Sequence, residues 1–99
     1  MPISRFDYDA MRTIAQRIER GGADLEAYLE QVQAAARGLE ERCRSPFAEA
    51  LQVRSAEWVR AGTEIARSLK ALGIDLARIV EAQRTAEEQE GARFAHLPQ

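Results

Sequence analysis

The amino-acid sequence predicts an all-α protein, an antiparallel hairpin of two long helices that pairs into a four-helix bundle. Its 99 residues suffice for one domain. Ala, Leu, Glu, Gln and Arg dominate the composition, and these side chains lose little rotamer freedom in a helix. Apolar residues recur at three- and four-residue steps through both halves of the chain. Pro46 alone interrupts the middle.

The first predicted helix covers about residues 7–41. A continuous series of apolar residues spaced seven apart marks one face of it, and further apolar residues widen that face. The Gly21–Gly22 pair lies inside this helix, and each glycine costs about 1 kcal/mol relative to alanine. A continuous helix with a close-packing notch is favoured, and a break at the pair is the alternative. The candidate interface residues of this helix are Met11, Ile14, Ile18, Leu25, Tyr28, Leu29 and Val32.

A turn is predicted at about residues 42–45. Ser45 is a good N-cap for a following helix, and Pro46 fits its first position, where the missing N–H removes no hydrogen bond. Cys43 and Arg44 complete the connection. The lone Cys43 is expected to be an inert thiol, and a cross-link to a neighbouring Cys43 is the minor alternative. A short connection of this kind makes the two helices antiparallel neighbours.

The second predicted helix covers about residues 46–90, followed by a flexible tail at 91–99. It carries one seven-residue series of large apolar side chains, including Trp58, and an interleaved series. Trp58 is expected to lie in the core or in the interface of a bundle. The candidate interface residues of this helix are Leu51, Trp58, Ile65, Leu69, Leu72, Leu76 and Ile79.

The apolar stripes are too wide for a simple two-helix seam. Such a seam needs two apolar positions per heptad, whereas both halves carry roughly three. A lone hairpin therefore leaves apolar surface in water, and exposed patches of this kind mark interaction sites. A second hairpin, completing a four-helix bundle, is the simplest way to cover that surface.

Several classes of function find no support in the sequence. The net charge of −2 disfavours nucleic acid as a partner. One histidine, His96, and one cysteine do not supply a metal site, and no cofactor is expected. No nucleophile lies near a candidate base, so no enzymatic activity is predicted. No segment approaches the roughly 20 apolar residues that span a bilayer, and no signal peptide is expected.

The chain resembles the Trp-x-Gly helical-hairpin proteins of type VII secretion, the early-secreted-antigen-like proteins. The resemblance extends from Met11 to about Phe94 and rests on length, the central turn and the order of apolar residues after Trp58. The segment from Ala82 to Gln89 is similar to the family's C-terminal segment. The turn lacks the Trp and Gly of the family motif, and the export motif Tyr-x-x-x-Asp/Glu is reduced to Gln83 and Glu87.

This resemblance implies a substrate or co-substrate of type VII secretion. Such a protein is made in the cytoplasm and leaves the cell without a cleaved signal peptide. It forms a homodimer, or a heterodimer with a related small hairpin that bears the complete export motif. Contact of the C-terminal segment with the secretion ATPase is also implied. The alternative is a cytoplasmic helical adaptor or chaperone that binds one helix of a client protein.

Overall fold

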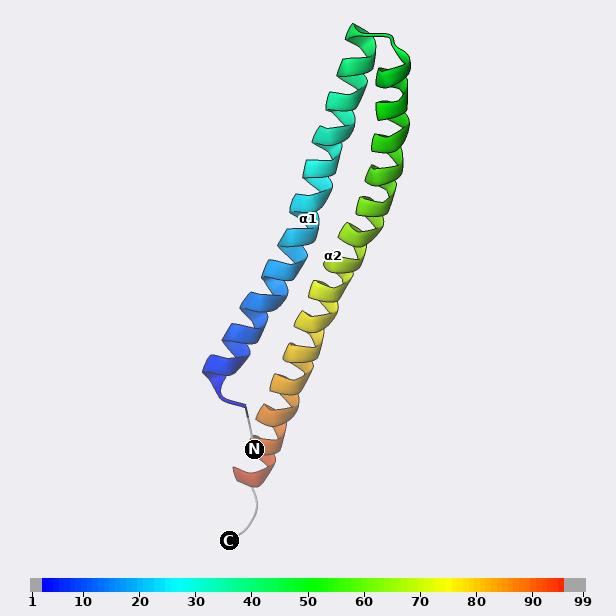
Figure 1. The fold of residues 1–99 in the computed structure, drawn as a ribbon. Helices are drawn as coiled ribbons and strands as arrows, with labels where there is room; N and C mark the ends of the chain where they lie inside the picture. The colour runs from blue at the N-terminus through cyan, green and yellow to red at the C-terminus, as the bar shows by residue number, and fades with distance from the viewer. Residues whose placement is uncertain (1–2, 96–99) are drawn as a thin grey trace.

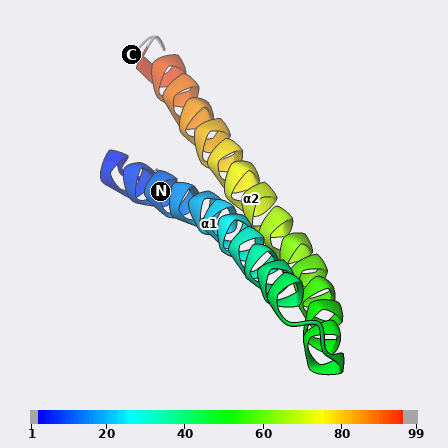
Figure 2. The same cartoon turned by 90° about the horizontal axis from the view of Figure 1, so that it is seen from above.

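The protein is an antiparallel helical hairpin. The computed structural model describes residues 3–95, apart from the side chains of Phe6, Phe94 and Ala95. Helix α1 (Arg5–Arg42) and helix α2 (Pro46–Ala95) run alongside each other and are joined at one end (Figure 1). Seen from above, the helices diverge from the joined end (Figure 2). They form a rod of 83 × 17 × 16 Å. The predicted all-α hairpin is confirmed.

Side-chain caps define where both helices begin. The Ser4 hydroxyl accepts a hydrogen bond from the Asp7 N–H at 3.2 Å, so α1 starts two residues earlier than predicted. Ser45 directly precedes Pro46, the first residue of α2. Its hydroxyl accepts a hydrogen bond from the Ala48 N–H at 3.1 Å. The predicted N-cap at Ser45 is therefore confirmed. Arg42 ends α1 and does not belong to the turn, which comprises residues 43–45.

Both helices are longer than the sequence predicted. Helix α1 passes through Gly21 and Gly22 without a break. Helix α2 continues to Ala95, so the prediction of a flexible tail was wrong for residues 91–95. Gly91 alone costs only about 1 kcal/mol, and good helix formers follow it. The rest of the predicted tail, residues 96–99 with His96, lies outside the described residues.

The seam between the helices is built mainly from small residues. A Cβ atom added to Gly22 would lie 2.7 Å from the backbone oxygen of Ala66, and one added to Gly73 would lie 2.7 Å from that of Ala15. The helix backbones therefore nearly touch at both glycines. The buried residues that share this seam are Tyr8, Ala15, Leu29 and Ala36 in α1, and Ala48, Ala66 and Val80 in α2.

Candidate interaction surface

Most of the large apolar side chains of α2 lie outside the seam. Trp58 is 63% exposed, Ile65 56%, Leu72 54% and Ile79 64%. On α1, Ile14 and Tyr28 are also more than half exposed. Seven exposed residues, which we call the apolar face, form the candidate interaction surface: Ile14, Tyr28, Leu51, Trp58, Ile65, Leu72 and Ile79.

Both helices contribute to the same side of the hairpin. Ile14 directly precedes the seam residue Ala15, and Ile65 directly precedes Ala66. Tyr28 and Ile79 stand in the same relation to buried neighbours. Residues with equal offsets from the seam point to the same side of two antiparallel helices, because the helices share one handedness and run in opposite directions. The exposed apolar residues of α1 and α2 therefore form one continuous surface.

The opposite side of the hairpin is polar and joined by ion pairs. Lys70 Nζ lies 3.3 Å from a carboxylate oxygen of Glu26, and Arg12 pairs with Glu81. These residues lie on the other flank of the seam from Ile14 and Ile65. Both pairs are partly exposed and contribute little stability individually. These pairs link the two helices on the flank of the seam opposite the apolar face.

The remaining predicted interface residues occupy two positions relative to this surface. Leu29 is 4% exposed and lies in the seam, where its side chain covers Gly62. A half-buried row lies between the seam and the apolar face. That row consists of Met11, Ile18, Leu25 and Val32 in α1, and Leu69 and Leu76 in α2. A protein docked on the apolar face would complete the burial of this row.

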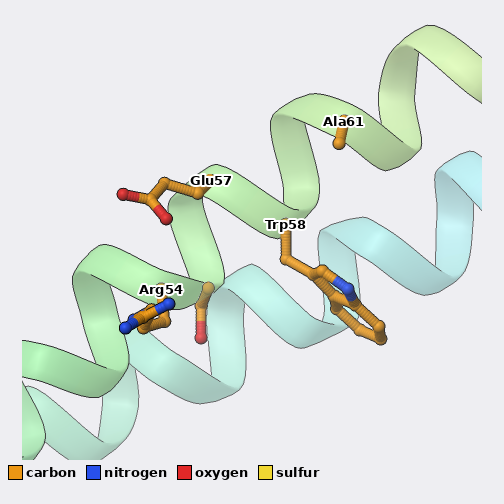
Figure 3. Close-up of a pocket in the computed structure, with 5 residues that line it drawn as sticks. Arg54, Glu57, Trp58 and Ala61 are labelled. Atoms are coloured by element: carbon orange, nitrogen blue, oxygen red, sulfur yellow. The ribbon is translucent and has the colours of Figure 1, made fainter.

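The apolar face carries a protruding side chain and two shallow hollows. The Trp58 indole projects away from the α2 backbone, and Glu57 points in a different direction, as Figure 3 shows. Both residues line an open hollow together with Arg54. A second shallow hollow follows α2 between Ile65 and Leu72. Both hollows are open to solvent. They have the form of spaces between helical side chains, which suits insertion of side chains from another helix.

A polar cluster closes the open end of the hairpin. Glu87 accepts hydrogen bonds from the Ile3 N–H, at 3.2 Å to each oxygen, and from the Gln83 amide at 3.3 Å. Tyr8, which is 4% exposed, places its hydroxyl near Glu87, and this buried hydroxyl forms no hydrogen bond within the described residues. The two residues of the reduced export motif therefore bond to each other, and the nearby phenol comes from α1. Tyr8 was not among the residues predicted from the sequence, although it stands seven residues before Ala15.

The cluster shifts the pKa values of both of its main members. Burial, followed by the nearby Glu87, raises the pKa of Tyr8 to about 12. The Tyr8 hydroxyl, followed by the Ile3 N–H, lowers the pKa of Glu87, although burial opposes this change. The carboxylate of Glu87 therefore stabilises the fold above its ordinary pKa, and this contribution is lost as the pH falls through its lowered value.

We expect Tyr8 to ionise near pH 12 in a Tyr28→Phe variant, where it is the only tyrosine left. Stability from the neutral phenol is complete below the unfolded pKa of about 10 and is lost as the pH rises through the folded value. Phenolate absorbance measures the titration, and circular dichroism at each pH reports whether the helices persist. A midpoint near 10 in the folded protein would contradict the burial of Tyr8.

The connection and the described surface offer no second site. Cys43 is exposed in the turn, next to Arg44. Within residues 3–95, no group of three or more His, Cys, Asp or Glu side chains is placed to hold a metal ion. Neither helix, over its described length, contains a stretch long and apolar enough to cross a membrane. Among the described residues, the apolar face is therefore the best candidate for a functional site.

Comparison with known proteins adds no further assignment. No protein family, curated protein or solved structure matches this chain.

Proposed function

We propose that this chain is a substrate or co-substrate of type VII secretion, exported without a cleaved signal peptide as a folded four-helix bundle of two hairpins. The observation that carries the proposal is the apolar face, which spans both helices on one side of the hairpin. Single exposed apolar residues are ordinary. A row from Leu51 to Ile79, reinforced by Ile14 and Tyr28, is the surface that a partner hairpin would cover.

The shape of the hairpin supports this form of assembly. The close seam is built mainly from Ala and Gly, together with Tyr8, Leu29 and Val80, and it leaves most of the large apolar residues outside it. Those residues remain available to a second hairpin, and the half-buried row would then become the centre of the bundle. The reduced motif at Gln83 and Glu87 supports a role as the partner that travels with a complete export signal, whether that signal is on a related hairpin or elsewhere in the complex.

We expect Ile65→Asp to prevent assembly while leaving the single hairpin folded. Ile65 is 56% exposed in the hairpin, so the substitution should change its stability by no more than about 0.5 kcal/mol. In a bundle the same carboxylate would be buried without a partner, at a cost of several kcal/mol. Light scattering after size-exclusion chromatography measures assembly. Glu64→Ala, at the adjacent exposed position, is the control and should assemble normally.

Export is tested with the same variants in cells that have a type VII secretion system. The chain should accumulate in the medium only when the secretion ATPase is present, and Ile65→Asp should remain in the cell. Equal amounts of the chain in the medium with and without the ATPase would contradict the proposal. Retention of the parent chain in the cytoplasm, bound to a larger client, would instead establish the adaptor alternative.

A further inference from the structure

The two ends of the hairpin are held together differently. At Gly73 the helix backbones nearly touch, since an added Cβ atom would lie 2.7 Å from the backbone oxygen of Ala15. From the joined end the helices diverge toward the open end, as Figure 2 shows. Beyond Ala15 and Gly73, the buried residues of the described part are Tyr8 in α1 and Val80 in α2. Apolar packing is therefore sparse at the open end.

The segment that precedes α1 closes this end. The Ile3 N–H donates to both carboxylate oxygens of Glu87, at 3.2 Å each, although the two residues are 84 positions apart in the sequence. Ser4, the next residue, caps α1 by accepting a hydrogen bond from the Asp7 N–H. Adjacent residues therefore define the start of α1 and attach it to α2, and the acceptor on α2 is a single carboxylate.

Charged groups lie around this hydrogen bond without forming an ion pair with Glu87. The hollow beside it is open to solvent and is lined by Ile3, Arg5, Tyr8, Arg84, Glu87 and Glu88. Arg5, from α1, forms no ion pair within the described residues, and Arg84, from α2, pairs with Glu88 at 3.1 Å. Hydrogen bonds to an ionised carboxylate are about twice as strong as neutral ones. Protonation of Glu87 would therefore directly weaken the attachment of Ile3.

We propose that residues 3–8 form a latch, which the ionised carboxylate of Glu87 closes and which opens when that carboxylate is protonated. In the open state the first turns of α1 separate from α2 as one unit, whereas the seam from Ala15 to the turn stays closed. Local openings of this kind occur in parts of a protein with few buried apolar contacts. The latch operates within a single hairpin and depends on neither its assembly nor its export.

Acid should open the latch before it disrupts the rest of the seam. The Tyr8 hydroxyl is the largest cause of the lowered pKa of Glu87; the Ile3 N–H and the charge of the N-terminus act in the same direction, and burial opposes them. Stability from the ionised carboxylate is complete above the unfolded pKa of about 4.3 and is lost as the pH falls through the lowered value. No charged side chain of the described residues is buried in the seam. The Glu26–Lys70 pair beside it is partly exposed and contributes little.

Two substitutions test the latch at neutral pH. Ile3→Pro removes the N–H that is donated, and Glu87→Gln removes the charge of the acceptor with little change in shape. Each should raise the open fraction on the order of tenfold. Hydrogen exchange of the backbone amides at residues 9–12 measures the open fraction, and the amides at residues 23–36 should exchange as in the parent chain. A latch gives residues 9–12 one common opening equilibrium, whereas simple fraying of α1 would give a gradient along them and would contradict the proposal.

Matched controls separate the latch from general effects at the open end. Ile3→Ala shortens the same side chain but keeps its backbone N–H. Glu88→Gln removes a charge that pairs within α2, and Glu81→Gln removes one that pairs with α1. Because these pairs are partly exposed, each of the three controls should change the open fraction less than about threefold. The double variant of Ile3→Pro with Glu87→Gln should open no further than the stronger single variant, because both act on one contact.

Spin labels at exposed positions follow the opening in acid. In a Cys43→Ser background, the labelled pairs are Ala10→Cys with Thr85→Cys across the open end, and Ala35→Cys with Ala56→Cys nearer the turn. As the pH falls from about 6 to about 3, through the range in which a glutamate titrates, a longer distance should appear at the open end while the distance nearer the turn is unchanged. With Glu87→Gln the longer distance should already be present at the higher pH. Distances that lengthen together at both places, or an Ile3→Ala variant as open as Ile3→Pro, would overturn the proposal.

Discussion

Leu29→Ala should destabilise the hairpin by roughly 2–5 kcal/mol, the usual range for truncating a buried leucine. Leu29 is the large aliphatic side chain in the seam, only 4% exposed. Its methyl groups fill the space over Gly62, where an added Cβ would lie 2.7 Å from Leu29 Cδ1. Gly62 and the adjacent Ala66 have no side-chain length with which to fill the cavity. Urea unfolding followed by circular dichroism measures the loss.

Tyr28→Ala is the matched control for this prediction. It removes a larger side chain at the neighbouring position, but Tyr28 is 55% exposed. The single hairpin should therefore change in stability by no more than about 0.5 kcal/mol, provided that the measurement is made below the concentration of self-association. Equal losses for the two variants would mean that the seam does not run through Leu29.

The fold was predictable because several local signals agree. The helix-forming composition, the three- and four-residue spacing, and the Ser45–Pro46 start signal all favour two helices joined by a short turn. A continuous α1 was favoured over a break because Gly21 and Gly22 could form a close-packing notch, and the structure supports this reason at Gly22. The closeness of α2 to Gly22 leaves no room for a side chain there.

The assignment of faces within each stripe was not predictable from residue size. The interface residues predicted from the sequence are the large apolar ones, including the series that contains Trp58 and Ile65. The structure instead places the small residues Ala66 and Gly73 against α1. A broad stripe contains several seven-residue series, and periodicity alone does not decide which of them faces the helix of the same chain. Small residues decide it here, because they let the backbones approach closely.

The candidate surface was predicted in substance but not in detail. The width of the stripes indicated surplus apolar area, and the exposure of Trp58 and Ile79 shows where it lies. The polar cluster at the open end was missed. Tyr8 and Glu87 are far apart in sequence, and only the register of the two helices brings them together. The seam glycines Gly22 and Gly73, where the backbones approach closely, help to set that register. Of these two, only Gly22 was considered in the prediction from sequence, as part of a pair at which the helix could break.

Gly22→Ala should destabilise the hairpin. Overpacking against α2 costs about 1–3 kcal/mol, and a gain of about 1 kcal/mol in helix propensity offsets part of this cost. The added methyl group would lie 2.7 Å from the backbone oxygen of Ala66 and equally close to Lys70 Cγ. The lysine side chain has room to move, but a carbonyl oxygen moves only with its helix. The two helices must therefore separate locally. Thermal unfolding followed by circular dichroism should show a lower midpoint.

The adjacent glycine should respond in the opposite direction. Gly21 has nothing within 4 Å of an added Cβ atom, so Gly21→Ala should stabilise the single hairpin by about 0.5–1 kcal/mol. Gly91→Ala, equally unhindered, is a second control. Opposite signs at neighbouring positions would distinguish close helix contact from a general effect of glycine on α1. If Gly22→Ala also raised the midpoint, the backbones would have to lie further apart than this seam requires.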